Sequence, residues 1–323
     1  MPNDFSIPTT ISAEARVALS AFALKYRNFD LPEQEDIQGW KSIHATFEER
    51  FAAVNAKVVE NYAPTIQKCE LGGVPCLDIR PRDWQKDSRV AVYVHGGGFA
   101  LFSAASTLTA AVPVAADLGI RVVSVDYTVA PHAKWQAITD QVMAVIAALV
   151  REGHALANIA IFGDSAGGAI VAGSVLKMRD QRRGMPGAVV LWSPWSDISA
   201  AGDTYDTLKD ADPILYWKHL EHFAGAYASP DDQQNPYVSP IYGDYTQGFP
   251  PTLIQFGTKE IFVSDAVRHY RVLERAQAQG GSGVLVTLDP YEGMWHVFQS
   301  FHPELPESKL ARSRMAEFFA KHL

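Results

Sequence analysis

The 323-residue chain, of 35.4 kDa, is 47% hydrophobic and 20% charged, which supplies a large core and excludes a disordered or fibrous protein. Its 28 basic and 36 acidic residues give a net charge of −8. Because the chain is acidic overall and has no stripe of Lys and Arg residues, we expect neither nucleic-acid binding nor attraction to anionic membranes.

The sequence has no apolar run near the roughly 18 residues that cross a bilayer, so we expect no membrane insertion. Its N-terminus places Asp4 and Glu14 before Arg16, unlike a secretory signal. The sequence therefore predicts a cytoplasmic protein.

The first 60 or so residues are predicted to be helical. Their apolar side chains recur at helical spacing, at Trp40, Ile43, Phe47, Phe51, Val54 and Val58.

A β-hairpin is predicted over residues 66–71 and 74–80, with Gly72-Gly73 at its turn. This register places Cys69 opposite Cys76, at a hydrogen-bonded position of the ladder with wide Cα spacing. We therefore expect two free thiols rather than a disulfide. No His and Cys cluster has the spacing of a zinc site, and no metal or cofactor is expected.

From Arg89 onward, short apolar runs alternate with helical stretches. Continuous apolarity is typical of strands buried on both faces, so the pattern predicts an α/β fold with a mostly parallel sheet flanked by helices. The runs are RVAVYVHGG, IRVVSVDY, NIAIFGDS, AVVLWSP, PTLIQFGT and VLVTLDPY. Residues 200–240 interrupt the alternation with an aromatic helical stretch.

Residues 163–168, GDSAGG, contain the pattern G-x-S-x-G between a predicted strand and a predicted helix. Small residues allow a tight turn that presents the Ser165 hydroxyl at the end of the strand, near the positive end of the helix dipole. This context favours Ser165 as a nucleophile over a simple turn.

Residues 95–99, HGGGF, end an earlier predicted strand. Three consecutive glycines can expose backbone N–H groups to a developing oxyanion. The segment lacks the spacing of a phosphate-binding or dinucleotide-binding loop, which leaves an oxyanion hole or a plain glycine-rich turn.

His296 follows the last predicted strand, so the chain order serine, acid, histidine is that of α/β-hydrolases, and we predict His296 as the base. His95 is expected to shape the glycine loop by hydrogen bonding. The other histidines are predicted to be surface or partly buried residues, at His44, His132, His154, His219, His222, His269, His302 and His322.

Two carboxylates follow the strand PTLIQFGT and could orient the base. Glu260 lies immediately past the strand, whereas Asp265 lies where the next helix begins and has an alternative role there. We favour Glu260 and keep Asp265 as the alternative.

Together these motifs resemble the bacterial branch of the hormone-sensitive-lipase-like family of α/β-hydrolase carboxylesterases. The resemblance covers roughly residues 66–323 and includes HGGGF, DYTVAP, GDSAGG, LWSPWSD, SPIYGD, GTKEIFVSD and GMWHVF. It implies an α/β-hydrolase fold, Ser165 as nucleophile, His296 as base, and an oxyanion hole formed by the N–H groups of Gly97, Gly98 and Ala166.

The resemblance also implies a helical cap. We assign residues 1–65 to an N-terminal cap segment, residues 66–323 to the catalytic domain, and residues 200–240 to a cap insertion within it. The chain departs from the family at Glu260-Ile261-Phe262, where many relatives have Asp-Pro-Leu, at His132, where glutamate is usual, and at Trp135-Gln136, where an aromatic-proline pair is usual.

The expected function is that of a serine carboxylesterase acting on a small-molecule ester through an acyl-enzyme. An amidase, lactonase or carbamate hydrolase would use the same residues, and a non-catalytic binding homologue is a further alternative. A homo-oligomer is compatible with the sequence.

Aromatic residues of the cap insertion, above Phe99 and Trp135, predict a closed apolar pocket for acyl chains of about two to eight carbons. We assign Phe99, Trp135 and Trp217 to this pocket. The cap candidates are Tyr205, Tyr216, Trp217, Phe223 and Tyr227.

Overall fold

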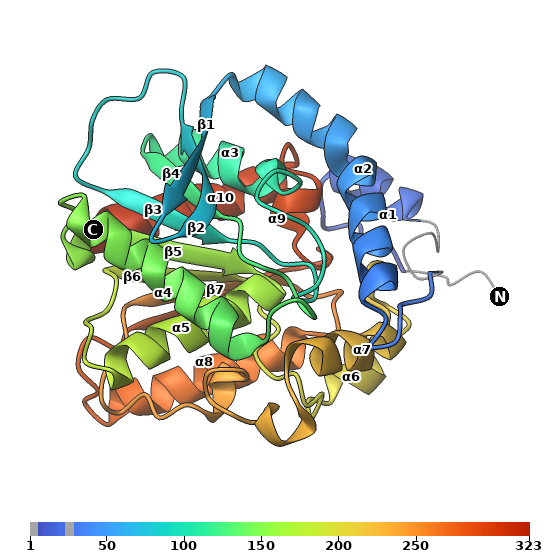
Figure 1. Cartoon of the computed structure of the whole chain (residues 1–323). Helices are drawn as coiled ribbons and strands as arrows, with labels where there is room; N and C mark the ends of the chain where they lie inside the picture. Colours follow the sequence, from blue (N-terminus) through green and yellow to red (C-terminus); the bar gives the residue numbers. More distant parts are fainter. Residues whose placement is uncertain (1–5, 23–28) are drawn as a thin grey trace.

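A computed structural model describes residues 6–22 and 29–323 and contains one eight-stranded sheet between layers of helices (Figure 1). The strands lie in the order β1-β2-β4-β3-β5-β6-β7-β8. They are β1 Thr65–Leu71, β2 Val74–Arg80, β3 Val90–Val94, β4 Arg121–Val125, β5 Ile159–Asp164, β6 Ala188–Trp192, β7 Thr252–Gly257 and β8 Val286–Tyr291.

The first two strands form the predicted hairpin at one edge of the sheet. β1 pairs with β2 and β2 with β4 in antiparallel fashion, and every later pairing is parallel. Cys69 lies opposite Cys76, as predicted, and both are free thiols. The mostly parallel sheet confirms the predicted α/β fold.

The central strands are buried on both faces, which explains their continuous apolar runs. In β3, Val90, Val92 and Val94 pack into the core on one face, whereas Ala91 and Tyr93 pack into the core on the other. Helices α4 and α5 cover the first face, and α3 and α10 cover the second (Figure 1).

Ten α-helices occur in the described residues. They are α1 Ala13–Ala21, α2 Ile37–Tyr62, α3 Leu108–Leu118, α4 Trp135–Arg151, α5 Ala166–Asp180, α6 Thr204–Thr207, α7 Trp217–Tyr227, α8 Val263–Ala278, α9 Phe298–Phe301 and α10 Pro306–His322. Within residues 6–22 and 29–323, none of them combines the length and apolarity that crossing a membrane requires.

The N-terminal region is less continuously helical than its apolar spacing predicts. Residues 29–36 contain no helix, and α2 begins at Ile37, where Asp36 accepts a hydrogen bond from the Gly39 N–H at 2.8 Å. Residues 1–5 and 23–28 of the predicted helical stretch lie outside the described residues.

Helix α1 is anchored to the C-terminal half of the chain. The Ser12 N–H and hydroxyl donate to the Glu307 carboxylate at 2.7 and 2.9 Å. Leu19 of α1 packs in a cluster with Met294 and Trp295, the residues that precede His296. The N-terminal segment therefore supports the loop that carries the predicted base.

Helices α2 and α7 come from the two segments assigned to the cap. They lie together over the end of the sheet where the carboxyl ends of the parallel strands are found (Figure 1). Trp40 of α2 contacts Phe223 of α7, with ring centroids 5.9 Å apart. This pairing brings chain segments far apart in sequence over one end of the sheet.

His269 of α8 is buried and joins two loops on the α8 side of the sheet. Its Nδ1 lies 2.8 Å from the Ser196 hydroxyl and its Nε2 lies 2.9 Å from the Tyr245 hydroxyl. Burial lowers the pKa of His269 to about 3, because the imidazolium would lose its hydration. The folded protein therefore holds this ring neutral.

We predict that His269→Gln makes the protein less sensitive to acid. The unfolded chain protonates this histidine near pH 6.5, whereas the folded chain does not until far lower pH, so folding stability falls as pH decreases below 6.5. Urea unfolding at pH 7 and pH 5 should show that the variant loses less stability between these pH values, by about 2 kcal/mol in total. Equal losses in both proteins would show that His269 titrates normally in the fold.

Candidate active site

Ser165 sits on a sharp turn between β5 and α5. Its φ of 53° and ψ of −123° lie outside the common regions for a residue with a side chain, and Ser165 immediately precedes the first helical residue, Ala166. Only glycine fits at residue 167, because a Cβ there would lie 2.1 Å from the carbonyl oxygen of Val94. The predicted strand-to-helix turn is thus present, with the Ser165 residue 7% exposed.

The structure joins His296 and Glu260, two residues predicted to act together. His296 Nδ1 donates to Glu260 Oε2 at 2.6 Å, and both side chains are buried. Glu260 Oε1 accepts a second hydrogen bond, of 3.2 Å, from the Gly257 N–H at the end of β7. The carboxylate is therefore held by the strand end and in turn fixes the imidazole.

The loops that carry His296 and Glu260 also bind each other through their backbones. The Lys259 N–H donates to the Met294 carbonyl at 2.9 Å. The Val297 N–H donates to the Ser193 hydroxyl at 3.1 Å, which ties the histidine loop to the end of β6. The Phe262 ring covers one side of the His296 imidazole, with the two ring centroids 5.2 Å apart.

Asp265, the alternative acid, has different partners. Its Oδ2 accepts hydrogen bonds from the Asp197 N–H at 2.9 Å and from the Tyr205 hydroxyl at 3.1 Å. Burial raises the pKa of Asp265 well above its usual value. The Asp265 carboxyl group therefore connects α8 to the loop after β6. The carboxylate that contacts His296 is that of Glu260.

The glycine loop after β3 lies beside Ser165. Gly97 has a φ of 97°, a left-handed conformation that favours glycine, and its carbonyl accepts from the Leu101 N–H at 2.9 Å. Gly97 and Gly98 both line the pocket that contains Ser165. Within residues 6–22 and 29–323, no hydrogen bond uses the N–H groups of Gly97 or Gly98.

Asp164 connects the glycine loop to the serine turn. Its Oδ1 accepts from the Tyr93 hydroxyl at 2.6 Å and from the Gly96 N–H at 3.1 Å. Burial raises the pKa of Asp164. Because Asp164 precedes Ser165 directly, this carboxyl group fixes the distance between the loop and the serine, a role that the sequence did not reveal.

His95 has the structural place that was predicted for it. Its Nδ1 lies 2.9 Å from the Gly96 carbonyl, and its ring stacks on Tyr127 with centroids 4.2 Å apart. Burial lowers the pKa of His95 to about 4, so the ring stays neutral near pH 7.

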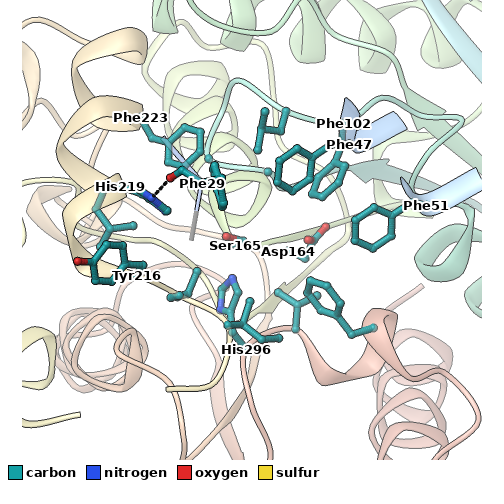
Figure 2. Close-up of a pocket in the computed structure, with 18 residues that line it drawn as sticks. Phe29, Phe47, Phe51, Phe102, Asp164, Ser165, Tyr216, His219, Phe223 and His296 are labelled. Carbon is teal, nitrogen blue, oxygen red and sulfur yellow. Dashed lines mark hydrogen bonds between the residues drawn. The ribbon is translucent and has the colours of Figure 1, made fainter. Parts of the chain in front are cut away.

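Ser165 and His296 line one cavity, and Figure 2 shows the imidazole directed toward Ser165. The rest of its wall is largely apolar. It combines Phe47 and Phe51 of α2, Phe102 and Leu101 of the glycine loop, Leu220 and Phe223 of α7, and Ile214 and Leu215 before α7. A substrate bound here would be shielded from water and would contact apolar side chains on most sides.

His219 closes the cavity at the α7 end, although its sequence context predicted an unremarkable residue. Its Nε2 lies 2.8 Å from the Phe29 carbonyl, the hydrogen bond drawn in Figure 2. Burial lowers the pKa of His219. This contact holds Phe29, another residue of the pocket wall, against α7.

The three residues assigned to the pocket lie elsewhere, and that assignment is wrong. Phe99 is fully buried and stacks on Tyr227 at 3.8 Å, because its side chain points into the core below the glycine loop. Trp135 donates to Asp232 Oδ2 at 3.0 Å at the start of α4. Trp217 is 48% exposed and lines a different surface cavity.

Of the aromatic residues proposed for the cap, Tyr216 and Phe223 line the cavity. Phe29, Phe102 and Phe301 also line the cavity, although no pattern in the sequence predicts them as pocket residues. A usable signal existed for α2, because Phe47 and Phe51 continue the apolar stripe that begins at Trp40. Both line the cavity, and Phe47 also packs against the core.

Asp212 is a buried carboxyl group that links the pocket wall to the Glu260 loop. Its Oδ1 accepts from the N–H groups of Ile214 and Leu215, both at 2.8 Å, and its Oδ2 accepts from the Ile261 N–H at 2.9 Å. Burial raises the pKa of Asp212 to about 6. The three hydrogen bonds hold Ile214 and Leu215 of the pocket wall close to Ile261, the residue that follows Glu260.

Over the described ranges 6–22 and 29–323, no three His, Cys, Asp or Glu side chains converge in a way that could hold a metal ion.

Comparison with known proteins places this geometry in a family. The family model for the alpha/beta hydrolase fold matches residues 91–300. An acetyl-hydrolase of Streptomyces hygroscopicus is 32% identical over 233 residues, which are 72% of this chain and 75% of that protein.

Two crystal structures of esterases superpose on nearly the whole chain. Esterase E25 does so with a TM-score of 0.89 and 27% identity, over 98% of this chain and 96% of its own. An esterase from the bacterial hormone-sensitive lipase family has a TM-score of 0.82 and 28% identity, over 96% of this chain and 98% of its own. The chain therefore belongs to the hormone-sensitive-lipase-like family of α/β-hydrolase esterases.

Proposed function

We propose that this ester hydrolase is a serine carboxylesterase that cleaves short- to medium-chain acyl esters, with Ser165 as nucleophile, His296 as base and Glu260 as the orienting acid. The observation that carries the proposal is the 2.6 Å hydrogen bond from His296 to Glu260, in a cavity that also contains Ser165. A serine, a histidine and a carboxylate in this arrangement can activate the hydroxyl for attack on a carbonyl carbon.

In the first half of the reaction, His296 Nε2 removes the Ser165 proton as the serine oxygen attacks the ester carbonyl. Glu260 accepts the Nδ1 hydrogen bond and stabilises the imidazolium that forms. The imidazolium then donates its proton to the departing alkoxide, which leaves an acyl group on Ser165.

The oxyanion that develops on the carbonyl would be held by the N–H groups of Gly97, Gly98 and Ala166. The first two N–H groups have no other partner in the part of the chain that the structure describes, and Ala166 lies at the N-terminal end of α5. Fixed donors of this kind lower the barrier because they need no reorganisation as charge appears.

In the second half, a water molecule takes the place of the alcohol and His296 removes one of its protons. The resulting hydroxide attacks the acyl-enzyme, and the carboxylic acid leaves as Ser165 regains its proton. The original Ser165 proton thus leaves with the alcohol and a proton from water replaces it, so Ser165 and His296 end each turnover in their starting protonation states.

The largely apolar wall of the cavity favours short hydrophobic acyl chains, of about two to eight carbons. A lactone, an amide or a carbamate would meet the same three side chains, so these substrates remain the alternatives within hydrolase chemistry. A non-catalytic binding role is opposed by the retained His296–Glu260 contact.

An ester panel tests the proposal. We expect p-nitrophenyl esters of two to eight carbons to be hydrolysed faster than longer ones, and Ser165→Ala to lower kcat by about 10⁴-fold or more. Ser42→Ala, on the exposed face of α2, is the matched control and should retain full activity. Ester turnover that persists in Ser165→Ala would remove Ser165 as nucleophile, and faster cleavage of long-chain triglyceride would contradict the pocket size.

The acid is tested by two isosteric changes. Glu260→Gln should lower kcat by several powers of ten, up to about 10⁴, because the amide cannot support the imidazolium. Asp265→Asn should keep most of the activity, since its partners are the Asp197 N–H and the Tyr205 hydroxyl.

Both variants are compared by kcat on one short-chain ester, with circular dichroism to verify folding. If Asp265→Asn were the inactive variant and Glu260→Gln nearly normal, the acid would be Asp265 and the observed His296–Glu260 contact would be structural only.

A further inference from the structure

A second cavity adjoins the one that contains Ser165. The two share five wall residues, which are Phe51, Phe102, Asp164, Val297 and Phe301. In Figure 2 the Asp164 carboxyl group lies between Ser165 and Phe51, at the side of the catalytic cavity opposite Tyr216 and His219. The second cavity is therefore an extension of the substrate site on that side.

The walls of the two cavities differ in chemistry. The part of the second cavity that is not shared is lined by Ser106, Thr107, Thr109 and Ser300. The Ser106 and Thr107 hydroxyl groups donate to the Ser103 carbonyl at 3.3 and 2.8 Å, so they offer a ligand lone pairs. Thr109 Oγ1 and Ser300 Oγ lie 2.9 Å apart and bond to each other. Since one proton suffices for that bond, the pair keeps a second hydroxyl proton and several lone pairs for a ligand.

Asp164 adds a strong acceptor at the junction. Both of its protein hydrogen bonds, from Tyr93 and Gly96, reach Oδ1. Within the described ranges, no other residue donates a hydrogen bond to Oδ2, and Asp164 lines both cavities. A carboxylate oxygen in this position favours a ligand that donates hydrogen bonds, and it repels an anionic ligand.

The chemistry of the proposed reaction indicates which half of an ester lies here. His296 must deliver a proton to the oxygen of the leaving alcohol, so that oxygen lies next to the imidazole. Val297 directly follows His296, and Ser300 and Phe301 follow within five residues; all three line the second cavity, and Val297 and Phe301 line the first cavity as well. The acyl half then lies among Leu215, Leu220 and the other apolar side chains of the first cavity.

We propose that the second cavity, named here the hydroxyl subsite and defined by Ser106, Thr107, Thr109, Asp164 and Ser300, binds the alcohol half of the substrate and selects small polyol alcohols. The preferred substrates are thus short-chain monoesters of glycerol-like alcohols. This inference rests on the proposed esterase function and specifies its substrate class. No Lys or Arg lines the subsite in the described residues, so a phosphorylated alcohol is disfavoured.

A matched substrate pair tests the inference. Glycerol 1-monobutyrate and propyl butyrate have the same acyl group and a three-carbon alcohol, and they differ only in two hydroxyl groups. We expect kcat/KM for the glycerol ester to exceed that for propyl butyrate by about tenfold or more, because a site built for hydroxyl groups rejects the analogue that lacks them. Ethyl 3-hydroxybutyrate, compared with ethyl butyrate, should show no such gain.

A double variant assigns the effect to the subsite. Thr109→Val with Ser300→Ala removes two mutually bonded hydroxyl groups together, which leaves neither unpaired. The preference for the glycerol ester should fall at least about fivefold. The matched control is Thr46→Val with Ser42→Ala on the exposed face of α2, where the same chemical changes lie outside both cavities and should leave the preference intact.

The outcomes separate the two proposals. If propyl butyrate and p-nitrophenyl butyrate are not hydrolysed at all, the esterase function itself fails. If they are hydrolysed but the glycerol ester is no better, or its advantage survives in the Thr109→Val, Ser300→Ala protein, the hydroxyl subsite is overturned while the esterase function stands. If kcat/KM rises only for ethyl 3-hydroxybutyrate, whose hydroxyl group is on the acyl half, the two halves of the substrate bind the other way round. That result would also overturn the hydroxyl subsite as the site of the alcohol.

Discussion

The contact between the Ser165 turn and the end of β3 is the constraint on which the site depends. Gly167 lies so close to the Val94 carbonyl that a Cβ would come within 2.1 Å of it. The next residue after Val94 begins the glycine loop, so this contact fixes the serine and the proposed oxyanion donors relative to each other. Asp164 then ties the same two segments through its hydrogen bond to the Gly96 N–H.

The remaining parts of the site are attached to this constraint from the other strands. Glu260 extends from the end of β7, and the loop after β8 carries His296 to meet it. The low polarity of the surrounding cavity strengthens the hydrogen bond between them, because water does not compete for the carboxylate. Helices α2 and α7, over the carboxyl ends of the parallel strands, supply the apolar wall that keeps water away from the carboxylate.

The sequence predicted the elements whose information is local. Ser165 stands in a short pattern between strand and helix, Glu260 lies three residues after the end of β7, and the hairpin register followed from the Gly72-Gly73 turn. The pocket could not be predicted in this way. Its walls come from Phe29, Phe51 and Phe223, residues of distant segments that meet only through tertiary packing, whereas Phe99 and Trp135 lie near the site in sequence but direct their side chains into other contacts.

The central claim, that Ser165 is the nucleophile, is tested most directly by the site of covalent attachment of a fluorophosphonate. This reagent forms a stable bond to an activated serine oxygen, so digestion and peptide mass spectrometry identify the modified residue. The proposed site predicts one modification, on Ser165, with loss of esterase activity in proportion to labelling. Attachment to another residue, or full activity after complete labelling of Ser165, would contradict it.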